Sequence, residues 1–138
     1  MNTAQPPVVL LTDDDHNIRE TTSMLLSFTG ATVREACSGH EASEILQKEK
    51  IDLLVTDLLM PDGDGRWLVN FVRSSPQFRH LPVIMISAHA DLKKIKEADG
   101  PKADLYLTKP FDPEQFIQTV TRLLAAPRTP PSVPPAVG

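Results

Sequence analysis

Five reactive side chains follow short apolar runs along this 138-residue chain. They are the carboxylates of Asp13, Asp14 and Asp57, the hydroxyl of Ser87 and the ammonium of Lys109. In an open parallel sheet, side chains just beyond the carboxyl ends of the strands meet in one cleft. Carboxylates gathered in a cleft repel one another unless a positive charge lies among them, so the pattern predicts a cation site.

The cation that best suits this cluster is Mg2+. The cluster offers hard oxygen ligands without thiolate or imidazole, and Mg2+ commonly combines one or two carboxylates with waters and a phosphate. Lys109 would add a second positive charge on the opposite side. A carboxylate between Mg2+ and a lysine suits attack on a phosphoryl group, because that transfer mainly needs positioning and charge neutralisation. We therefore expect Asp57 to be a nucleophile that becomes an aspartyl phosphate.

Strands and helices in strict alternation would position these residues. Short apolar runs predict the strands, and apolar residues at helical spacing predict the helices between them. Five such pairs predict an α/β fold with a parallel sheet, helices on both faces and right-handed crossovers. The expected strands are 8–11, 32–36, 53–56, 82–86 and 105–108, and the expected helices cover about 16–29, the segments around 42–46 and 68–72, about 91–98, and 113 to about 124.

Local signals mark the ends of several helices. Ser38 followed by Glu41 forms a capping-box pattern. Asp112 can cap a helix that has Pro113 in its first position, and Gly30 is placed as a helix C-cap.

Composition narrows the class of protein. Fourteen Lys and Arg against eighteen Asp and Glu give a net charge of -4, which argues against a nucleic-acid binder. The single cysteine, Cys37, excludes an internal disulfide and suits a reducing compartment. With neither a signal peptide nor an apolar run of about 18 residues, no membrane association is expected and the predicted location is cytoplasmic.

We expect a short extension at 1–7, one domain at 8–125 and a Pro-rich tail or linker at 126–138.

Four segments together resemble the receiver domain of bacterial two-component response regulators. The likeness runs from about Val8 to Ala125. It implies a flavodoxin-like (βα)5 doubly wound sheet with strand order 2-1-3-4-5, in three α/β/α layers. The segments are 10–15 (LLTDDD), 57–65 (DLLMPDGDG), 87–88 (SA) and 106–111 (YLTKPF).

The resemblance assigns a phosphoacceptor and a metal site. Asp57 matches the phosphoacceptor and would also contact the metal. Asp13 and Asp14 match the acidic pair that holds Mg2+, and Leu59 matches the position whose backbone carbonyl completes the metal site.

The resemblance also assigns the residues that respond to phosphorylation. Ser87 matches the hydroxyl residue that hydrogen-bonds the phosphoryl group, although a Ser at this position could instead cap the next helix. Lys109 matches the family's invariant lysine, and Pro110 matches a proline that follows a cis peptide bond. Tyr106 matches the aromatic residue that turns inward when the hydroxyl residue moves, with a partly buried core residue as the alternative.

By this resemblance the chain is a phosphorylation-controlled switch in a phosphorelay, not an enzyme in the usual sense. It would catalyse its own phosphotransfer and dephosphorylation. The donor would be a phosphohistidine on a sensor histidine kinase or on a histidine phosphotransfer protein. The surface formed by 91–98, 105–108 and the last helix would contact an output domain or downstream protein, and a phosphorylation-dependent homodimer is also consistent with the resemblance.

Two other functions compete with this one. A haloacid-dehalogenase-type phosphatase would use Asp13 as its nucleophile and Asp15 as its partner, but too little chain follows Lys109 for the further acidic pair of that class. A receiver-fold scaffold that works without phosphorylation would be expected to lack at least one of the five core residues. A flavodoxin-type electron carrier is excluded, because three aspartates stand where it needs a phosphate-binding loop.

Some positions depart from the family pattern. Thr12 stands where an apolar residue is commoner, and His16 stands where proline is frequent. The sequence 99–101 (DGP) interrupts the region after the fourth helix, where Gly-Ala is usual. The four histidines, His40 among them, are isolated in the sequence and are expected on the surface without ligand roles.

Overall fold

Strands and helices alternate throughout residues 5–125, the part of the chain that the computed structural model describes. The expected tail at 126–138 and the first four residues of the expected extension lie outside that part. The strands are β1 (Val8–Thr12), β2 (Thr32–Ala36), β3 (Leu53–Asp57), β4 (Val83–Ser87) and β5 (Leu105–Thr108). The helices are α1 (His16–Ser27), α2 (Gly39–Lys48), α3 (Gly65–Ser74), α4 (His89–Glu97) and α5 (Pro113–Ala125).

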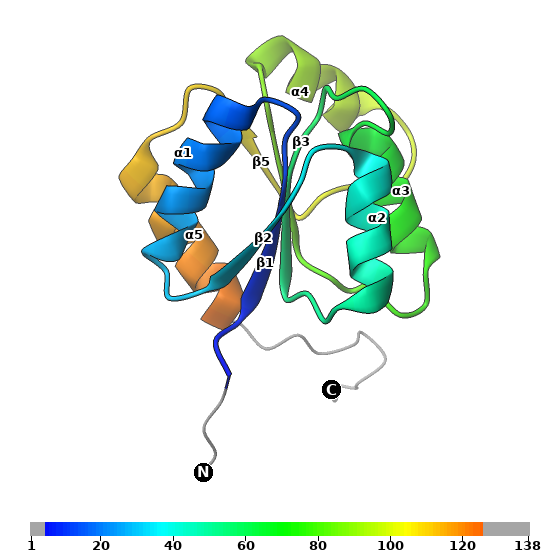
Figure 1. Ribbon diagram of the computed structural model, residues 1–138. Coiled ribbons are helices and arrows are strands. Elements are labelled where there is room, and N and C mark those ends of the chain that lie inside the picture. The colour runs from blue at the N-terminus through cyan, green and yellow to red at the C-terminus, as the bar shows by residue number, and fades with distance from the viewer. Residues whose placement is uncertain (1–4, 126–138) are drawn as a thin grey trace, which may run out of the picture.

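The strands form one parallel sheet in the order β2-β1-β3-β4-β5. This order confirms the predicted doubly wound fold. β1 and β3 lie in the middle of the sheet, between α1 on one side and α2 on the other (Figure 1). Asp57 and Ser87 are the last residues of β3 and β4, so each strand extends up to a residue of the predicted site.

Two apolar cores lie on opposite faces of the sheet, because residues along each strand alternate between the faces. On the face of α1 and α5, Val9, Val55 and Ile84 pack with Leu26 and Phe116. The other face is covered by α2, α3 and α4, and its core includes Leu10, Leu54 and Met85 from the strands (Figure 1). These three layers hold the carboxyl ends of the strands at one edge of the sheet.

The two predicted N-terminal helix caps are present, with one change of partner. The Asp112 carboxylate accepts a hydrogen bond from the Gln115 N–H at the start of α5. At the start of α2, the Ser38 hydroxyl accepts from the Glu41 N–H. The Glu41 carboxylate, however, accepts from Cys37, one residue before the position that a capping box uses.

Two helix boundaries differ from the prediction. α1 ends at Ser27 rather than near 29, so its C-cap is Phe28 and the prediction of Gly30 as the C-cap is wrong. Gly30 lies two residues beyond Phe28 with a positive φ of 84°. α4 begins at His89 rather than at 91, and no side chain caps it. The prediction for α4 relied on its few apolar positions, which do not mark the first turn of a polar helix.

The loop after α4 is fixed by a side chain from α3. The Arg73 guanidinium donates hydrogen bonds to the carbonyls of Leu81 (2.7 Å) and Lys102 (3.1 Å), and it pairs with the Asp104 carboxylate at 2.8 Å. Gly100, within the unusual 99–101 segment, has a φ of 113°. Arg73 therefore holds the segment that leads into β5, the strand that positions Lys109.

Candidate functional site

Three of the predicted carboxylates come together at the carboxyl edge of the sheet. One carboxylate oxygen from each of Asp13, Asp14 and Asp57 lies within 4.8 Å of the others. Asp13 is buried, Asp14 is exposed, and the Asp57 side chain is 11% exposed. Such a half-open group of oxygen donors fits Mg2+, which keeps several of its waters when it binds to proteins.

Hydrogen bonds fix Asp13 at the start of the loop after β1. Its N–H donates to the Ala36 carbonyl at 3.1 Å, and its Oδ1 accepts from the Asp15 N–H at 2.9 Å. The Arg19 guanidinium donates to the Asp13 carbonyl at 2.7 Å. The Asp15 carboxylate, in turn, accepts from the Ile18 N–H and caps α1.

Burial makes the ionised form of two carboxyls in this cluster costly. Burial is the main cause that raises the pKa of Asp13, and the charges of Asp14 and Asp15 raise it further. Burial also raises the pKa of Asp57, whereas Lys109, whose Nζ lies 3.3 Å from Asp57 Oδ1, lowers it. The net direction is upward for both carboxyls, so ionising them is costly without a further positive charge.

In Mg2+-free protein, Asp13→Asn is expected to raise the free energy of unfolding at neutral pH. A carboxyl whose pKa is higher in the folded protein than in the unfolded chain destabilises the fold once it ionises. That penalty is fully present above the folded pKa and disappears as the pH falls towards the unfolded value. Urea denaturation at neutral and acidic pH measures the difference, which should shrink on acidification.

The exposed neighbour Asp14 provides the control for this prediction. Asp14→Asn changes the same charge where the side chain is solvated, so its effect should be smaller. Added Mg2+ should stabilise the wild type more than Asp13→Asn, because the variant loses a charged ligand. An Asp13→Asn protein that is no more stable than wild type at neutral pH would contradict the assigned cost of this carboxylate.

The loop after Asp57 carries Leu59, the predicted carbonyl ligand. The Leu58 N–H donates to the Ile86 carbonyl at 3.1 Å, and the Gly65 N–H donates to the Leu58 carbonyl at 2.8 Å. A Cβ at Gly65 would lie 2.4 Å from the Asp57 carbonyl oxygen, so only glycine fits where α3 begins. Leu59 lies between these anchors and is 58% exposed.

Ser87 ends β4 and Lys109 follows the neighbouring strand β5, at the same edge of the sheet. Ser87 is buried, and its carbonyl accepts a hydrogen bond from the Lys109 N–H at 2.9 Å. The peptide bond between Lys109 and Pro110 is cis, as the resemblance implies. Ala88, not Ser87, is the N-cap residue of α4, so the alternative assignment of Ser87 as a helix cap is wrong.

Tyr106 lies half-buried on β5, on the same face of the sheet as Ser87. It pairs with Met85, and Ser87 pairs with Thr108, so the two side chains are diagonal neighbours. The Tyr106 hydroxyl accepts a hydrogen bond from the Ala103 N–H at 3.0 Å, and the Lys96 ammonium lies 5.3 Å from the ring centroid. Tyr106 thus joins β5 to α4 and to the loop between them.

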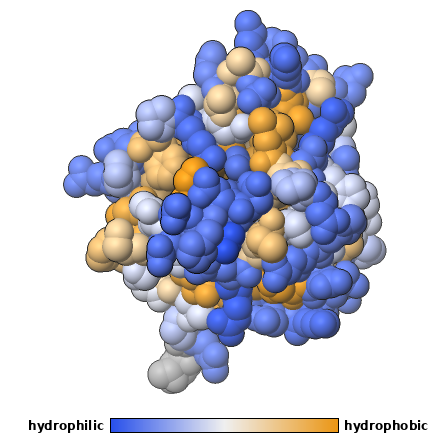
Figure 2. All heavy atoms as spheres, turned by 45° about the horizontal axis from the view of Figure 1, so that its top comes forward, coloured by the Kyte–Doolittle hydropathy of each residue, from blue (hydrophilic) through white to orange (hydrophobic). Residues whose placement is uncertain are grey.

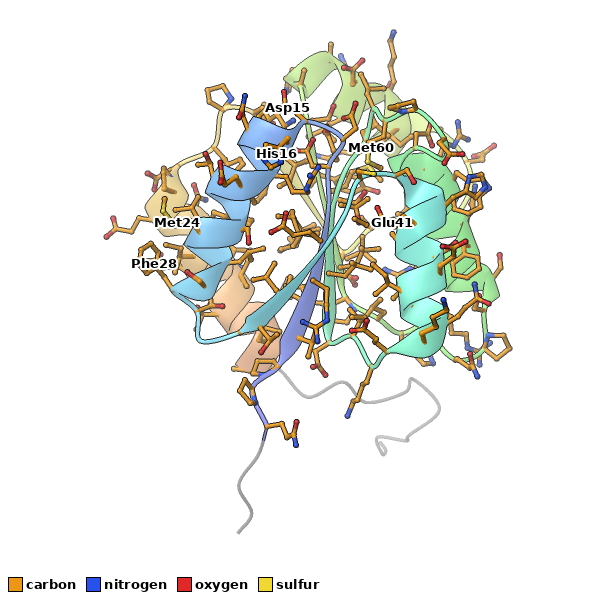
Figure 3. All side chains as sticks on the ribbon, viewed as in Figure 1. Asp15, His16, Met24, Phe28, Glu41 and Met60 are labelled. Atoms are coloured by element: carbon orange, nitrogen blue, oxygen red, sulfur yellow. The ribbon has the colours of Figure 1, made fainter. Side chains whose placement is uncertain are left out.

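A groove of about 560 Å3 opens beside Lys109, between α1 and the segment from β5 to α5. Its lining is mainly apolar and includes Ile18, Leu25 and Phe111. Met24 on α1 and Phe28 just after the helix are exposed and point away from the sheet (Figure 3). The carboxyl edge itself presents a largely hydrophilic surface with apolar patches (Figure 2). An apolar surface therefore adjoins the charged site.

Two features of the site region were not predicted. The Thr12 hydroxyl is buried and has no hydrogen-bond partner within residues 5–125. His40 is exposed, as expected, but it is not isolated, because its Nδ1 lies 2.7 Å from Asp62 Oδ1. No local sequence signal marks that pair, since its members are 22 positions apart.

Comparisons with known proteins identify the family. The family described as response regulator receiver domain matches residues 9–121. The chain is 36% identical over 121 residues to the transcriptional regulatory protein GltR of Pseudomonas aeruginosa, covering 84% of this chain and 48% of that protein. It is 35% identical to a 14.6 kDa protein of Leptolyngbya boryana, covering 91% and 96%. This chain thus spans about half the length of GltR and nearly all of the second relative.

Solved structures agree with the sequence relatives. A response regulator structure from Chloroflexus aurantiacus superposes with a TM-score of 0.81 at 34% identity, covering 88% of this chain and all of that one. The chemotaxis response regulator CheY4 of Vibrio cholerae gives a TM-score of 0.78 at 32% identity, covering 86% and 99%. Together with the strand order and the acidic edge of the sheet, these matches show that the chain belongs to the response regulator receiver domain family of two-component systems.

Proposed function

We propose that this receiver domain is a phosphorylation-controlled switch whose phosphoacceptor is Asp57. The observation that carries the proposal is the position of Asp57, which lies between an acidic pair and the Lys109 ammonium at the end of β3. Asp13, Asp14, Asp57 and the Leu59 carbonyl would hold Mg2+. The oxygen donor set and the raised pKa of Asp13 and Asp57 support that assignment.

In the proposed transfer, an Asp57 carboxylate oxygen attacks the phosphorus of a donor phosphohistidine. The new O–P bond forms as the N–P bond breaks, and the electron pair of the broken bond leaves with the imidazole nitrogen. Lys109 offsets the negative charge on the phosphoryl oxygens, and Ser87 donates a hydrogen bond to one of them. When bound, Mg2+ supplies further positive charge at the same oxygens.

The effect of phosphorylation would then be transmitted from Ser87 to Tyr106. Movement of Ser87 towards the phosphoryl group frees space on the face of the sheet that Tyr106 shares. A Tyr106 that moves must give up its present contact with the Ala103 N–H. The surface of α4, β5 and α5 would change as a result, and an output domain or downstream protein would read that change.

Tyr106→Ala is expected to reduce the phosphorylation-induced change in amide hydrogen exchange of α4 and β5 by about half or more. The alanine removes both the ring and the contact that joins β5 to Ala103. Exchange measured with and without acetyl phosphate and Mg2+ gives the change for each variant. Tyr106→Phe keeps the ring and should retain most of the response. A full response in Tyr106→Ala would exclude the switch role of this residue.

A protein donor would dock in the groove beside Lys109. The groove is continuous with the site, because Lys109 lines both, and its apolar walls suit a helix face of a histidine kinase or of a histidine phosphotransfer protein. Within the described residues, no helix is long and apolar enough to cross a membrane. Because the chain matches only 48% of GltR, a transcriptional regulatory protein, a receiver joined to an output domain is one arrangement in which the proposed switch would act.

The phosphatase alternative has less support. It needs Asp15 free to act with Asp13, but the Asp15 carboxylate accepts a hydrogen bond from the Ile18 N–H and caps α1.

Intact-mass spectrometry after incubation with acetyl phosphate tests the proposal against both alternatives. A gain of one phosphoryl group that needs Mg2+ supports the switch, whereas no gain favours the scaffold. Release of phosphate from unrelated monoesters without an adduct favours the phosphatase.

A further inference from the structure

The apex of the loop after the phosphoacceptor rests on the first turn of α2. We propose that His40 is a positioning residue that holds this loop through Asp62 and thereby raises the affinity of the site for Mg2+. The inference rests on the proposed function, since it takes the Leu59 carbonyl as a metal ligand.

Backbone hydrogen bonds make the first contact between the loop and α2. The Gly39 N–H donates to the Gly63 carbonyl at 2.8 Å, and the His40 N–H donates to the Asp62 carbonyl at 3.3 Å. These donors belong to the first turn of a helix, where N–H groups have no partner inside the helix. A Cβ at Gly39 would lie 2.3 Å from the Gly63 carbonyl oxygen, so the two backbones lie too close together for any residue other than glycine at position 39.

The His40 side chain adds a contact specific to this chain. Its Nδ1 lies 2.7 Å from Asp62 Oδ1, and because an ionised carboxylate only accepts hydrogen bonds, the imidazole N–H is the donor. Asp62 has a φ of 57°, a backbone conformation that L-residues seldom adopt. The imidazole also meets the ring of Trp67 edge-on, with 4.5 Å between centroids. The His40 side chain thus adds a contact to a residue that already has a strained backbone conformation.

The anchors of this loop lie on both sides of the predicted ligand. Leu58 is tied to β4 and to Gly65, and Asp62 and Gly63 are tied to α2. Leu59 lies between these two anchors, with Met60 and Pro61 completing the span. A ligand carbonyl that is already held in place loses less conformational freedom on binding than one in a mobile loop. Loss of the His40 contact should therefore weaken Mg2+ binding without changing any metal ligand.

His40→Ala is expected to weaken Mg2+ binding about two- to fivefold in a calorimetric titration of the full chain. The change is modest because both partners are more than half exposed, which limits what such a pair contributes. His40→Gln keeps an N–H donor and should lose less affinity. In an Asp62→Gly background, where the carboxylate is absent, His40→Ala should cause little further loss.

A matched control removes a similar contact at the other end of α2. Glu49→Gln removes the negative charge from the exposed pair in which Arg34 Nε lies 2.7 Å from Glu49 Oε1, and it should leave Mg2+ affinity unchanged. Trp67, the only tryptophan in the chain, contacts His40 and gives a second readout, because Mg2+ should alter its fluorescence less in His40→Ala than in wild type.

The outcomes separate this inference from the proposed function. Wild type that binds Mg2+ while His40→Ala binds it equally well would overturn the positioning role and leave the metal site standing. An equal loss of affinity in Glu49→Gln would also overturn it, because the effect would then be a general one on α2. Wild type that binds no Mg2+ would overturn the metal site and this inference together.

Discussion

Asp57→Asn is expected to abolish phosphoryl transfer from acetyl phosphate, with a rate at least about 1000-fold below that of wild type. A neutral amide has the shape of the carboxylate but not the negative charge that attacks phosphorus. The fold should survive, because the side-chain amide oxygen of the variant can still accept the Leu58 N–H that Asp57 accepts at 3.0 Å. Intact-mass spectrometry over a time course measures the loss.

The control for this variant changes an acidic residue away from the cluster. Glu44→Gln, on the exposed side of α2, should be labelled at the wild-type rate. Circular dichroism should show that both variants are folded. Labelling of Asp57→Asn at the wild-type rate would mean that another residue accepts the phosphoryl group.

Lys109→Ala is expected to slow the same transfer about 100-fold. The Lys109 ammonium lies 3.3 Å from Asp57 and lowers the pKa of that carboxyl, so its loss both weakens charge neutralisation at the phosphoryl group and raises the pKa of Asp57 further. The labelling rate of the variant should recover in part as the pH is raised, because more Asp57 is then ionised. Rates measured across a pH series check both effects.

Two lysine variants test whether the effect belongs to this position. Lys109→Arg keeps the charge but not the compact ammonium, and an intermediate rate is expected. Lys93→Ala removes an exposed lysine from α4 and should leave the rate unchanged. A Lys109→Ala rate close to that of wild type would remove Lys109 from the proposed mechanism.

The fold and the acidic cluster could be predicted because both depend on periodic local patterns. Apolar runs that end in Asp13, Asp57 and Ser87 identify parallel strands, and parallel strands end at one edge of a sheet. The helix cap at Asp112 could also be predicted, because a cap residue and its partner are three positions apart in the sequence. For these residues, spacing in the sequence is enough to predict which groups lie close together.

Contacts between distant segments could not be predicted in the same way. His40 follows β2 and Asp62 follows β3, and the two meet because both strands pair with β1, which places the loops after them at the same edge of the sheet. The start of α4 at His89 depends on packing of a polar helix that has few apolar anchors. The Tyr106 hydroxyl contact depends on the path of the loop that Arg73 holds. None of these three features leaves a periodic signal.

The most direct test of the central claim is to locate the phosphoryl group chemically. Wild-type protein is incubated with acetyl phosphate and Mg2+ and then reduced with borohydride, which converts an aspartyl phosphate to homoserine, and its peptides are sequenced by mass spectrometry. We expect homoserine at position 57, and its absence when Mg2+ is withheld. Homoserine at Asp13, or no modified residue in protein that binds Mg2+, would contradict the assignment of Asp57 as the phosphoacceptor.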